Sequence, residues 1–413
     1  MLRLFTIIKY INICMLLLWL FLPQANAQQY FRLEQKRVTM HFNFIRNMIV
    51  VPLTINDKGP YNFILDTGVD LMIITDPALV DSLNITNKRL IRVTGMGEGN
   101  DFEAYLTSAL KVSMPNVIGE HISAAILKKD EFGLSNYAGI NIHGLLGYEF
   151  FSSFSVRVNF MDSTITMASP RDMRLFKRGD KIQMSIEDHK PYITSRISIS
   201  GKTPEKENKL ILDLGAGHPL SLENLIGENK GLPEKFIASN LGISLTGPIN
   251  GFLSRIDQIE IGKYRITNVI TSFPDYDTVK KNLIAVKRNG NLGMEILKKF
   301  NLIIDYQNGI LYLKPNLSFK DQFEHDMSGM EYFADGPGLT HIIINNVERG
   351  SAAAEIGLKK GDELVKINFV PVERMGIEQI DHVFRSRENR SVLLEVFHDN
   401  IYEKFILTLK RRI

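Results

Sequence analysis

The sequence is almost free of cysteine and tryptophan, with one residue of each among 413. Both lie close to the N-terminus, at Cys14 and Trp19. A single cysteine excludes an intrachain disulfide, and it excludes zinc sites built from paired cysteines. The nine histidines are scattered and form no His-Glu-x-x-His pattern. The sequence therefore predicts no metal and no cofactor, and His218 is interpreted as an ordinary core or surface histidine.

The motifs of several common enzyme classes are also missing. No Gly-x-Ser-x-Gly sequence marks a serine nucleophile, and no Gly-x-x-x-x-Gly-Lys-Ser/Thr sequence marks a phosphate-binding loop. The formal net charge is only +3, which argues against nucleic acid or an anionic membrane surface as a partner. The hydrophobic fraction of 44% and the charged fraction of 23% are typical of a globular protein. The length predicts two or three domains.

The N-terminus has the pattern of a secretory signal peptide. Arg3 and Lys9 precede the apolar run Ile13–Leu22, and the small residues of Ala25–Ala27 follow as a cleavage site. The apolar run is short for a membrane-spanning helix, so an uncleaved anchor is the less favoured alternative. We therefore expect residues 1–27 to be removed and the mature protein to be secreted or periplasmic, without a stable membrane span.

The stretch Phe63–Asp70 combines an apolar run with one acid, one hydroxyl and one glycine. Asp66, Thr67 and Gly68 follow the apolar residues, and a second apolar run, Leu71–Ile74, comes directly after. A carboxyl group at the end of a buried strand has its pKa raised by desolvation unless neighbouring groups compensate. Glycine permits a tight turn that a side chain would resist. The alternative is an ordinary Asp-Thr-Gly turn between two strands.

Three landmarks of the first half return in the second half in the same order. Leu210–Gly217 repeats the Asp66 stretch 147 residues later, and its acid is Asp213. The two other pairs of matching segments are Gly144–Phe151 with Gly290–Leu297, and Val156–Ile165 with Leu302–Ile310. Three landmarks at one spacing predict the same domain twice, over residues 28–170 and 171–318. Each copy offers one aspartate at a glycine turn.

Two such aspartates suggest a specific chemistry when they face each other. Carboxyl groups within hydrogen-bonding distance cannot both ionise, so they share one proton. The ionised group can activate a water molecule, and the protonated group can donate to a peptide carbonyl. This arrangement supports general acid–base hydrolysis of an amide without a metal or a covalent intermediate.

Both halves resemble retropepsin-like aspartic proteases, and the resemblance extends over Val38–Lys314. That family combines an Asp-Thr-Gly motif, a glycine-rich flap hairpin and a later apolar-apolar-Gly turn beside the active site. The matching segments here are Asp66-Thr67-Gly68, the flap glycines Gly95, Gly97 and Gly99, Leu145-Leu146-Gly147, Asp213-Leu214-Gly215 and Asn291-Leu292-Gly293.

The resemblance implies a mainly β protein with two β-barrel lobes related by a pseudo-twofold axis. It implies that Asp66 and Asp213 are the catalytic pair. The residues that would set their geometry are Thr67, Gly68, Leu214 and Gly215. The resemblance further implies that the region of Gly97 forms the tip of a flap over the cleft.

Two residues depart from the family pattern. Leu214 stands where the family has Thr or Ser, so one of two reciprocal hydroxyl-to-backbone contacts is missing. Val69 stands where Ser, Thr or Ala usually follows the glycine. The second lobe also lacks an obvious glycine-rich flap, although Gly247–Gly251 is expected to form a stiffer hairpin. Because of these departures, the alternative that Asp213 belongs only to a structural turn stays open.

A third unit is predicted over residues 331–413, after a linker at 319–330. Gly350–Asp362 resembles the Gly-Ser-x-Ala-x-x-Ala-Gly-Leu-x-x-Gly-Asp segment of bacterial PDZ domains, with Ile356 in place of an alanine. Such α+β domains bind extended peptides at a sheet edge and hold the terminal carboxylate with backbone N–H groups. The predicted carboxylate loop is Gly338, Leu339, Thr340 and His341. The alternative is a PDZ domain that only packs against the protease lobes.

These observations predict a secreted or periplasmic aspartic endopeptidase with two β lobes and a PDZ domain. Its partners would be a peptide or protein substrate and a C-terminal peptide ligand. The alternative from another class is an inactive pseudo-peptidase that binds peptides without cutting them, which Leu214 and Val69 favour. A purely structural envelope protein would leave the two aspartates unexplained.

Overall fold

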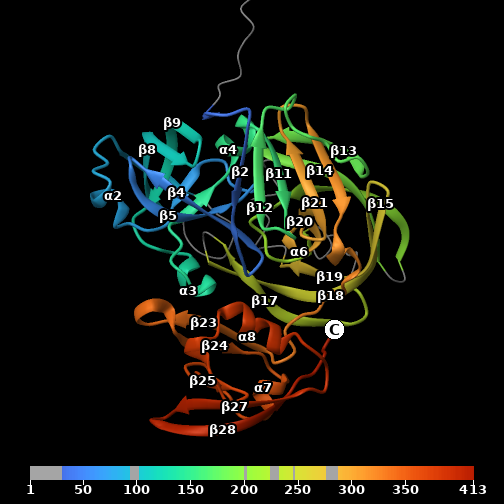
Figure 1. The fold of residues 1–413 in the computed structure, drawn as a ribbon. Helices are drawn as coiled ribbons and strands as arrows, with labels where there is room; N and C mark the ends of the chain where they lie inside the picture. Colours follow the sequence, from blue (N-terminus) through green and yellow to red (C-terminus); the bar gives the residue numbers. More distant parts are fainter. Residues whose placement is uncertain (1–29, 94–101, 200–201, 224–231, 245–246, 276–286) are drawn as a thin grey trace, which may run out of the picture.

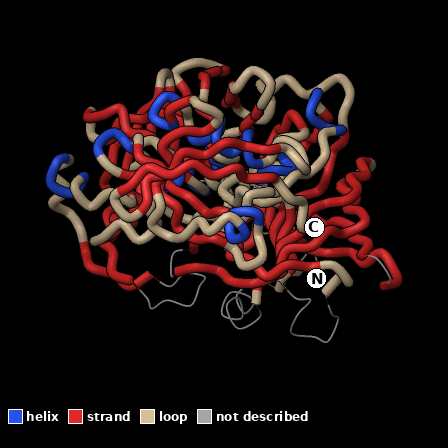
Figure 2. Tube along the Cα trace, turned by 90° about the horizontal axis from the view of Figure 1, so that it is seen from below, coloured by secondary structure: helices blue, strands red, loops and turns tan. Residues whose placement is uncertain are grey.

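The computed structural model describes residues 30–93, 102–199, 202–223, 232–244, 247–275 and 287–413. Two β-rich lobes lie together, and the C-terminal unit lies beneath them (Figure 1). Strands dominate the trace and the helices are short (Figure 2). The expected signal peptide and the predicted flap residues Gly95, Gly97 and Gly99 lie outside the described residues. No helix within the described ranges is long and apolar enough to cross a bilayer.

The first lobe is built on one curled sheet. Six of its strands close into a ring in the order β9-β6-β10-β5-β4-β8, because β8 also pairs with β9. Strands β1, β3 and β7 extend this ring at its margins. The bounds are β1 (Phe31–Leu33), β3 (Asn43–Ile45), β4 (Met48–Ile55), β5 (Lys58–Leu65), β6 (Met72–Ile74), β7 (Arg89–Val93), β8 (Phe102–Met114), β9 (Val117–Leu127) and β10 (Gly144–Leu146).

The second lobe repeats this ring strand for strand. Its order is β19-β16-β20-β15-β14-β18, and β18 pairs with both β19 and β14. The bounds are β13 (Asp180–Glu187), β14 (Lys190–Ile199), β15 (Lys202–Leu212), β16 (Leu220–Leu222), β17 (Phe236–Ser244), β18 (Gly247–Ile261), β19 (Tyr264–Pro274) and β20 (Gly290–Leu292). In both lobes the strand that ends at the aspartate runs parallel to a short strand, β5 to β10 and β15 to β20. The predicted duplication is therefore confirmed at the level of topology.

A second set of strands joins the two lobes. Strands β2, β12 and β11 come from the first lobe, and β21, β22 and β13 come from the second. They lie side by side because β11 pairs antiparallel with β21, with Ser155 opposite Asp305. The bounds are β2 (Arg37–His41), β11 (Ser155–Asn159), β12 (Thr164–Ala168), β21 (Phe300–Asp305) and β22 (Ile310–Pro315).

One buried apolar cluster runs through both lobes, so they share a core. Short helices cover the ends of the sheets: α2 (Leu79–Ser82), α3 (Leu134–Ala138), α4 (Tyr148–Ser153), α6 (Met294–Leu297) and the 3-10 turn η2 (Leu317–Lys320). Asp76 Oδ1 accepts a hydrogen bond of 3.0 Å from Ala78 N just before α2.

The second lobe contains a long hairpin that the sequence did not predict clearly. Strands β17 and β18 pair from Phe236 opposite Ser254 to Ser244 opposite Gly247. Gly247–Gly251 therefore does not form a hairpin by itself and lies within β18, which corrects that expectation. In the strand order, β17 and β18 take the place that β7 and β8 have in the first lobe.

The C-terminal unit has its own core and a sheet of order β23-β24-β25-β27-β28. Phe323 still packs in the protease core and Met327 in the C-terminal core, so the chain crosses between them. The short helix at Ala352–Glu355 is capped by Ser351 Oγ, which accepts from Ala354 N at 3.2 Å. The bounds are β23 (Met330–Asp335), η3 (Pro337–Leu339), β24 (His341–Val347), α7 (Ala352–Glu355), β25 (Glu363–Ile367), β26 (Val370–Pro371), η4 (Val372–Arg374), α8 (Ile377–Phe384), β27 (Ser391–His398) and β28 (Ile401–Thr408).

Candidate active site

The two predicted aspartates follow equivalent strands. Asp66 comes directly after β5 and its N–H donates to Leu146 O at 3.0 Å. Asp213 comes directly after β15 and its N–H donates to Leu292 O at 3.0 Å. In each lobe a short parallel strand therefore holds the backbone at the point where the turn begins. This explains why a segment that ends in Leu-Gly accompanies each Asp motif.

The two turns meet closely, and the glycines make this approach possible. A methyl group at Gly215 would lie 2.2 Å from Asp66 Cγ. A methyl group at Gly68 would lie 3.0 Å from Asp66 Oδ1 and 3.1 Å from Asp213 Oδ2. The two carboxyl groups are within hydrogen-bonding reach of each other. Gly215 is thus required because the Asp66 carboxyl group lies directly against its backbone, and Gly68 leaves little room beside the two carboxyl groups.

Four hydrogen bonds orient the two carboxyl groups, one to Asp66 and three to Asp213. Asp66 Oδ1 accepts from Gly68 N at 2.6 Å. Asp213 Oδ1 accepts from Gly215 N at 2.9 Å and from Ala216 N at 3.1 Å. Asp213 Oδ2 also accepts from the side-chain amide of Asn291 at 2.6 Å.

Thr67 joins the two turns across the lobe boundary. Its fully buried hydroxyl donates to Leu212 O at 2.6 Å and accepts from Leu214 N at 2.9 Å. Leu214 occupies the equivalent position in the second lobe, where its side chain is buried in the shared core. The reciprocal contact is therefore one-sided, as the sequence predicts.

Burial dominates the electrostatics of the pair. The pKa of Asp66 is raised well above its ordinary value, first by burial and then by the charge of Asp213. The Gly68 N–H and the charge of Lys190 act in the opposite direction. The pKa of Tyr306 beside the pair is also raised, by burial and then by the two carboxyl groups. Burial and the neighbouring charge therefore favour the protonated form of Asp66.

Two turns reach across the lobe boundary beside the pair, and the sequence did not reveal them. In the first lobe, Asn47 donates from its amide to Gly217 O at 2.9 Å. In the second lobe, His189 Nδ1 lies 2.5 Å from Asp70 Oδ1, and its ring stacks on Tyr148 at 4.2 Å. Positions 70 and 217 each lie four residues after an aspartate, so these contacts follow the pseudo-twofold symmetry. Turn composition indicates the turns themselves, but no local pattern predicts their distant partners.

His218 lies near Asp213, and burial lowers its pKa. The described part of the chain contains no group of three His, Cys, Asp or Glu side chains placed to hold a metal ion.

The predicted carboxylate loop of the C-terminal unit does not lie at a free edge of the sheet. Gly338, Leu339 and Thr340 line a cavity of about 290 Å³, together with Ile342 and residues 372–377. His341 instead pairs with Glu363, with Nδ1 and Oε1 2.7 Å apart.

The loop precedes β24, which pairs with β23 on one side and β25 on the other. A peptide strand can add only to an unpaired edge, so this loop does not fit the predicted role. Among the described strands, β23 and β28 are the outer strands of this sheet, and β23 is the one that lies next to β24.

The first lobe covers that edge. Tyr332 O accepts from Arg46 Nη1 at 3.3 Å, and Ala334 O accepts from Asn136 Nδ2 at 2.8 Å. Arg46 also binds Asp381 of α8 through two nitrogens, at 2.9 and 2.7 Å, and its side chain is only 7% exposed. Side chains of the protease lobe therefore occupy outward carbonyl groups of the edge strand.

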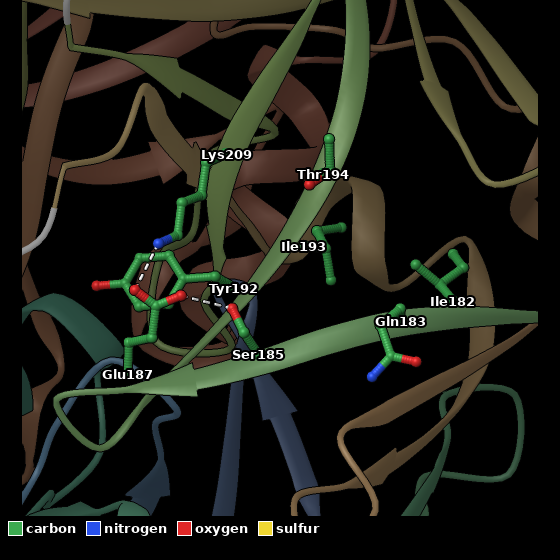
Figure 3. Close-up of a pocket in the computed structure, with 8 residues that line it drawn as sticks. All are labelled: Ile182, Gln183, Ser185, Glu187, Tyr192, Ile193, Thr194 and Lys209. Atoms are coloured by element: carbon green, nitrogen blue, oxygen red, sulfur yellow. Dashed lines mark hydrogen bonds and ion pairs between the residues drawn. The ribbon is translucent and has the colours of Figure 1, made fainter.

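A larger cavity of about 460 Å³ lies on the second lobe (Figure 3). Its charged groups are already paired, since Lys209 Nζ lies 2.6 Å from Glu187 Oε2 and Ser185 Oγ donates to Glu187 Oε1 at 2.8 Å. None of the predicted site residues lines it. The lining residues are Ile182, Gln183, Ser185, Glu187, Tyr192, Ile193, Thr194 and Lys209.

Comparison with known protein families matches two segments of the chain. An aspartyl protease family model matches residues 51–150, and a PDZ domain model matches residues 343–396. The comparison with curated proteins gave no match. The chain thus contains an aspartyl protease domain of the retropepsin-like type and a PDZ domain. The second lobe lies outside both matches, and its relation to the first rests on the repeated topology.

Proposed function

We propose that this chain, with its aspartyl protease and PDZ domains, is an aspartic endopeptidase that uses Asp66 and Asp213 together. The observation that carries the proposal is the meeting of the two carboxyl groups against the backbones of Gly68 and Gly215. No family match covers Asp213, so its catalytic role rests on this geometry.

The proposed reaction needs one ionised and one protonated carboxyl group. A water oxygen forms a bond to the peptide carbonyl carbon while its proton passes to the ionised carboxylate. The protonated carboxyl gives its proton to the carbonyl oxygen, which produces a neutral gem-diol. The diol then collapses: the C–N bond breaks, the nitrogen takes a proton from one carboxyl, and a hydroxyl returns a proton to the other. The products are a carboxylic acid and an amine, and the pair regains its starting state.

The test is cleavage of a broad peptide library by the purified protein and by two variants. Asp66→Asn and Asp213→Asn should each lower cleavage by at least about 100-fold, because each role fails without the other. Activity should follow a bell-shaped pH profile in the acidic to weakly acidic range. Because the pKa of Asp66 is raised, the proton needed for activity is lost only as the pH rises above the ordinary aspartate range.

Two outcomes would contradict the proposal in different ways. Undiminished cleavage by Asp213→Asn, with Asp66→Asn inactive, would mean that a second chain supplies the partner aspartate. Peptide binding without cleavage by the wild type at any pH would leave the pseudo-peptidase, which the buried apolar Leu214 favours.

We further propose that the protein acts outside the cytoplasm. The support is the signal-peptide pattern of residues 1–27. Mass spectrometry of the N-terminus after expression in a bacterial host should find a chain that begins at Gln28, in the periplasm or the medium. An intact Met1 in the membrane fraction would contradict export with cleavage.

A further inference from the structure

Among the positions at which the two lobes differ, one places a side-chain donor on an aspartate of the pair. Asn291 stands on β20 in the second lobe, where the first lobe has Leu145 on β10. Both strands run parallel to the strand that ends at the aspartate, and the two residues lie in equivalent registers, opposite Ile211 and Ile64. The family resemblance assigns an apolar residue to this position, so a side-chain amide here is a departure.

The amide makes the environments of the two carboxyl groups unequal. Asn291 Nδ2 lies 2.6 Å from Asp213 Oδ2, while two backbone N–H groups donate to Oδ1. Among the described residues, Asp66 accepts from one backbone N–H, that of Gly68, and Leu145 has no donor to offer. Hydrogen bonds donated to a carboxylate favour its ionised form. The donor set therefore favours the charge on Asp213.

The other titratable groups near Asp213 do not reverse this preference. They are Asp66, His218, Arg288 and Tyr306. Lys190 acts on Asp66 and favours its ionised form, but its charge is the smallest of the influences on that carboxyl group. Burial lowers the pKa of His218 and raises that of Tyr306, so both groups favour their neutral forms. Arg288 is cationic and engages a buried carboxylate, with its Nε 2.7 Å from Glu223 Oε2.

We infer that Asn291 is a positioning residue that holds Asp213 as the ionised member of the pair and leaves the shared proton on Asp66. The roles in hydrolysis that this inference gives to the two aspartates rest on the proposed function. Asp213 then takes the proton from the attacking water, and Asp66 gives its proton to the peptide carbonyl oxygen. The amide of Asn291 orients Oδ2 of Asp213.

The charge assignment is tested without any activity. Aspartate labelled with ¹³C at its carboxyl carbon reports ionisation by NMR, and the Asp213 signal is assigned by its loss in Asp213→Asn. In the Asp66→Asn background, adding Asn291→Leu should move the Asp213 titration midpoint upward by about 1 pH unit, because a donor to the charged form is lost. Asn291→Ala gives a second, smaller substitution should the leucine variant misfold. An unchanged or lowered midpoint in a folded variant would overturn the inference.

The enzymatic arm uses the pH profile of kcat/KM. Asn291→Leu should shift the acidic limb upward by about 1 pH unit, since Asp213 must be ionised to act. The matched variant Leu145→Asn places an amide beside Asp66 and should shift the alkaline limb downward. A uniform loss of kcat with unmoved limbs would indicate a merely structural role and would overturn the inference. Should the wild type cleave nothing while the NMR midpoint still moves, the proposed function fails and the charge assignment stands.

Discussion

Glu149 and Glu295 hold the same place in the two lobes and meet very different partners. Glu295 accepts hydrogen bonds from Arg385 at 2.9 Å and from Asn47 at 3.2 Å. Glu149 Oε1 accepts from Ser123 N at 3.3 Å, and its Oε2 is buried without a partner among the described residues. Burial accordingly raises the pKa of Glu149 from 4.5 to about 7. A single carboxyl group of this kind makes the stability of the protein depend on pH.

Glu149→Gln should remove that dependence. The unfolded chain ionises Glu149 near pH 4.5 and the folded chain near 7, so the wild type loses stability relative to the variant as the pH rises between these values. Above about pH 7 the loss is complete and amounts to at most about 3 kcal/mol. Urea unfolding of both proteins at pH 4.5 and pH 8 measures the difference.

Glu295→Gln is the matched control for this prediction. It removes the carboxylate that pairs with Arg385, so it should destabilise the protein at pH 8. If the free energy of unfolding depended on pH in the same way in the wild type and in Glu149→Gln, the prediction would be contradicted.

At the scale of elements, the active-site turns are joined by one hydroxyl. Thr67 satisfies both Leu212 O and Leu214 N, which belong to the end of β15 and the turn that follows. The symmetric hydroxyl is missing because position 214 is leucine. The hydroxyl group that aligns the two turns with each other therefore comes from the first lobe alone.

Thr67→Val keeps the shape of the side chain and leaves both backbone groups unpaired. It should lower the free energy of unfolding by about 2 kcal/mol and reduce hydrolysis. Urea unfolding and peptide cleavage measure the two effects.

Thr67→Ser keeps the hydroxyl and is the control, with a smaller loss expected. Adding Leu214→Thr to Thr67→Val moves the hydroxyl to the symmetric position and should recover part of the activity. Equal stability and equal peptide cleavage for Thr67→Val and Thr67→Ser would show that the hydroxyl group does not align the two turns.

At the scale of the whole molecule, the PDZ domain is bound through the strand that would receive a peptide. Arg46 and Asn136 of the first lobe donate to Tyr332 O and Ala334 O on β23. Arg46 also lies between the rings of Tyr137 and Tyr332, at 4.7 and 5.0 Å. Because strand addition requires free backbone groups, a C-terminal peptide competes with the protease lobe for this edge. The same turn carries Asn47, whose amide holds the loop after Asp213 at Gly217.

The double variant Arg46→Ala/Asn136→Ala should therefore bind C-terminal peptides at least about 10-fold more tightly than the wild type, since competing donors are removed. Fluorescence anisotropy with a library of labelled peptides measures the affinities, and amidated peptides control for recognition of the carboxylate. Equal affinity for both proteins would show that the edge is already open to a peptide.

The sequence alone determined the strands around the Asp66 turn, the duplicated lobes and the PDZ domain. These features follow from local patterns, because apolar runs, glycine turns and repeat spacing record which segments form strands and turns. Only the tertiary structure decided that Asn291 contacts Asp213, that His189 meets Asp70, and that β23 rather than β24 is the sheet edge. Each of these depends on residues far apart in the chain, whose meeting is set by how strands pair and lobes pack. The predicted carboxylate loop was misplaced for this reason: glycines before a strand reveal a turn, but not whether the strand has a free edge.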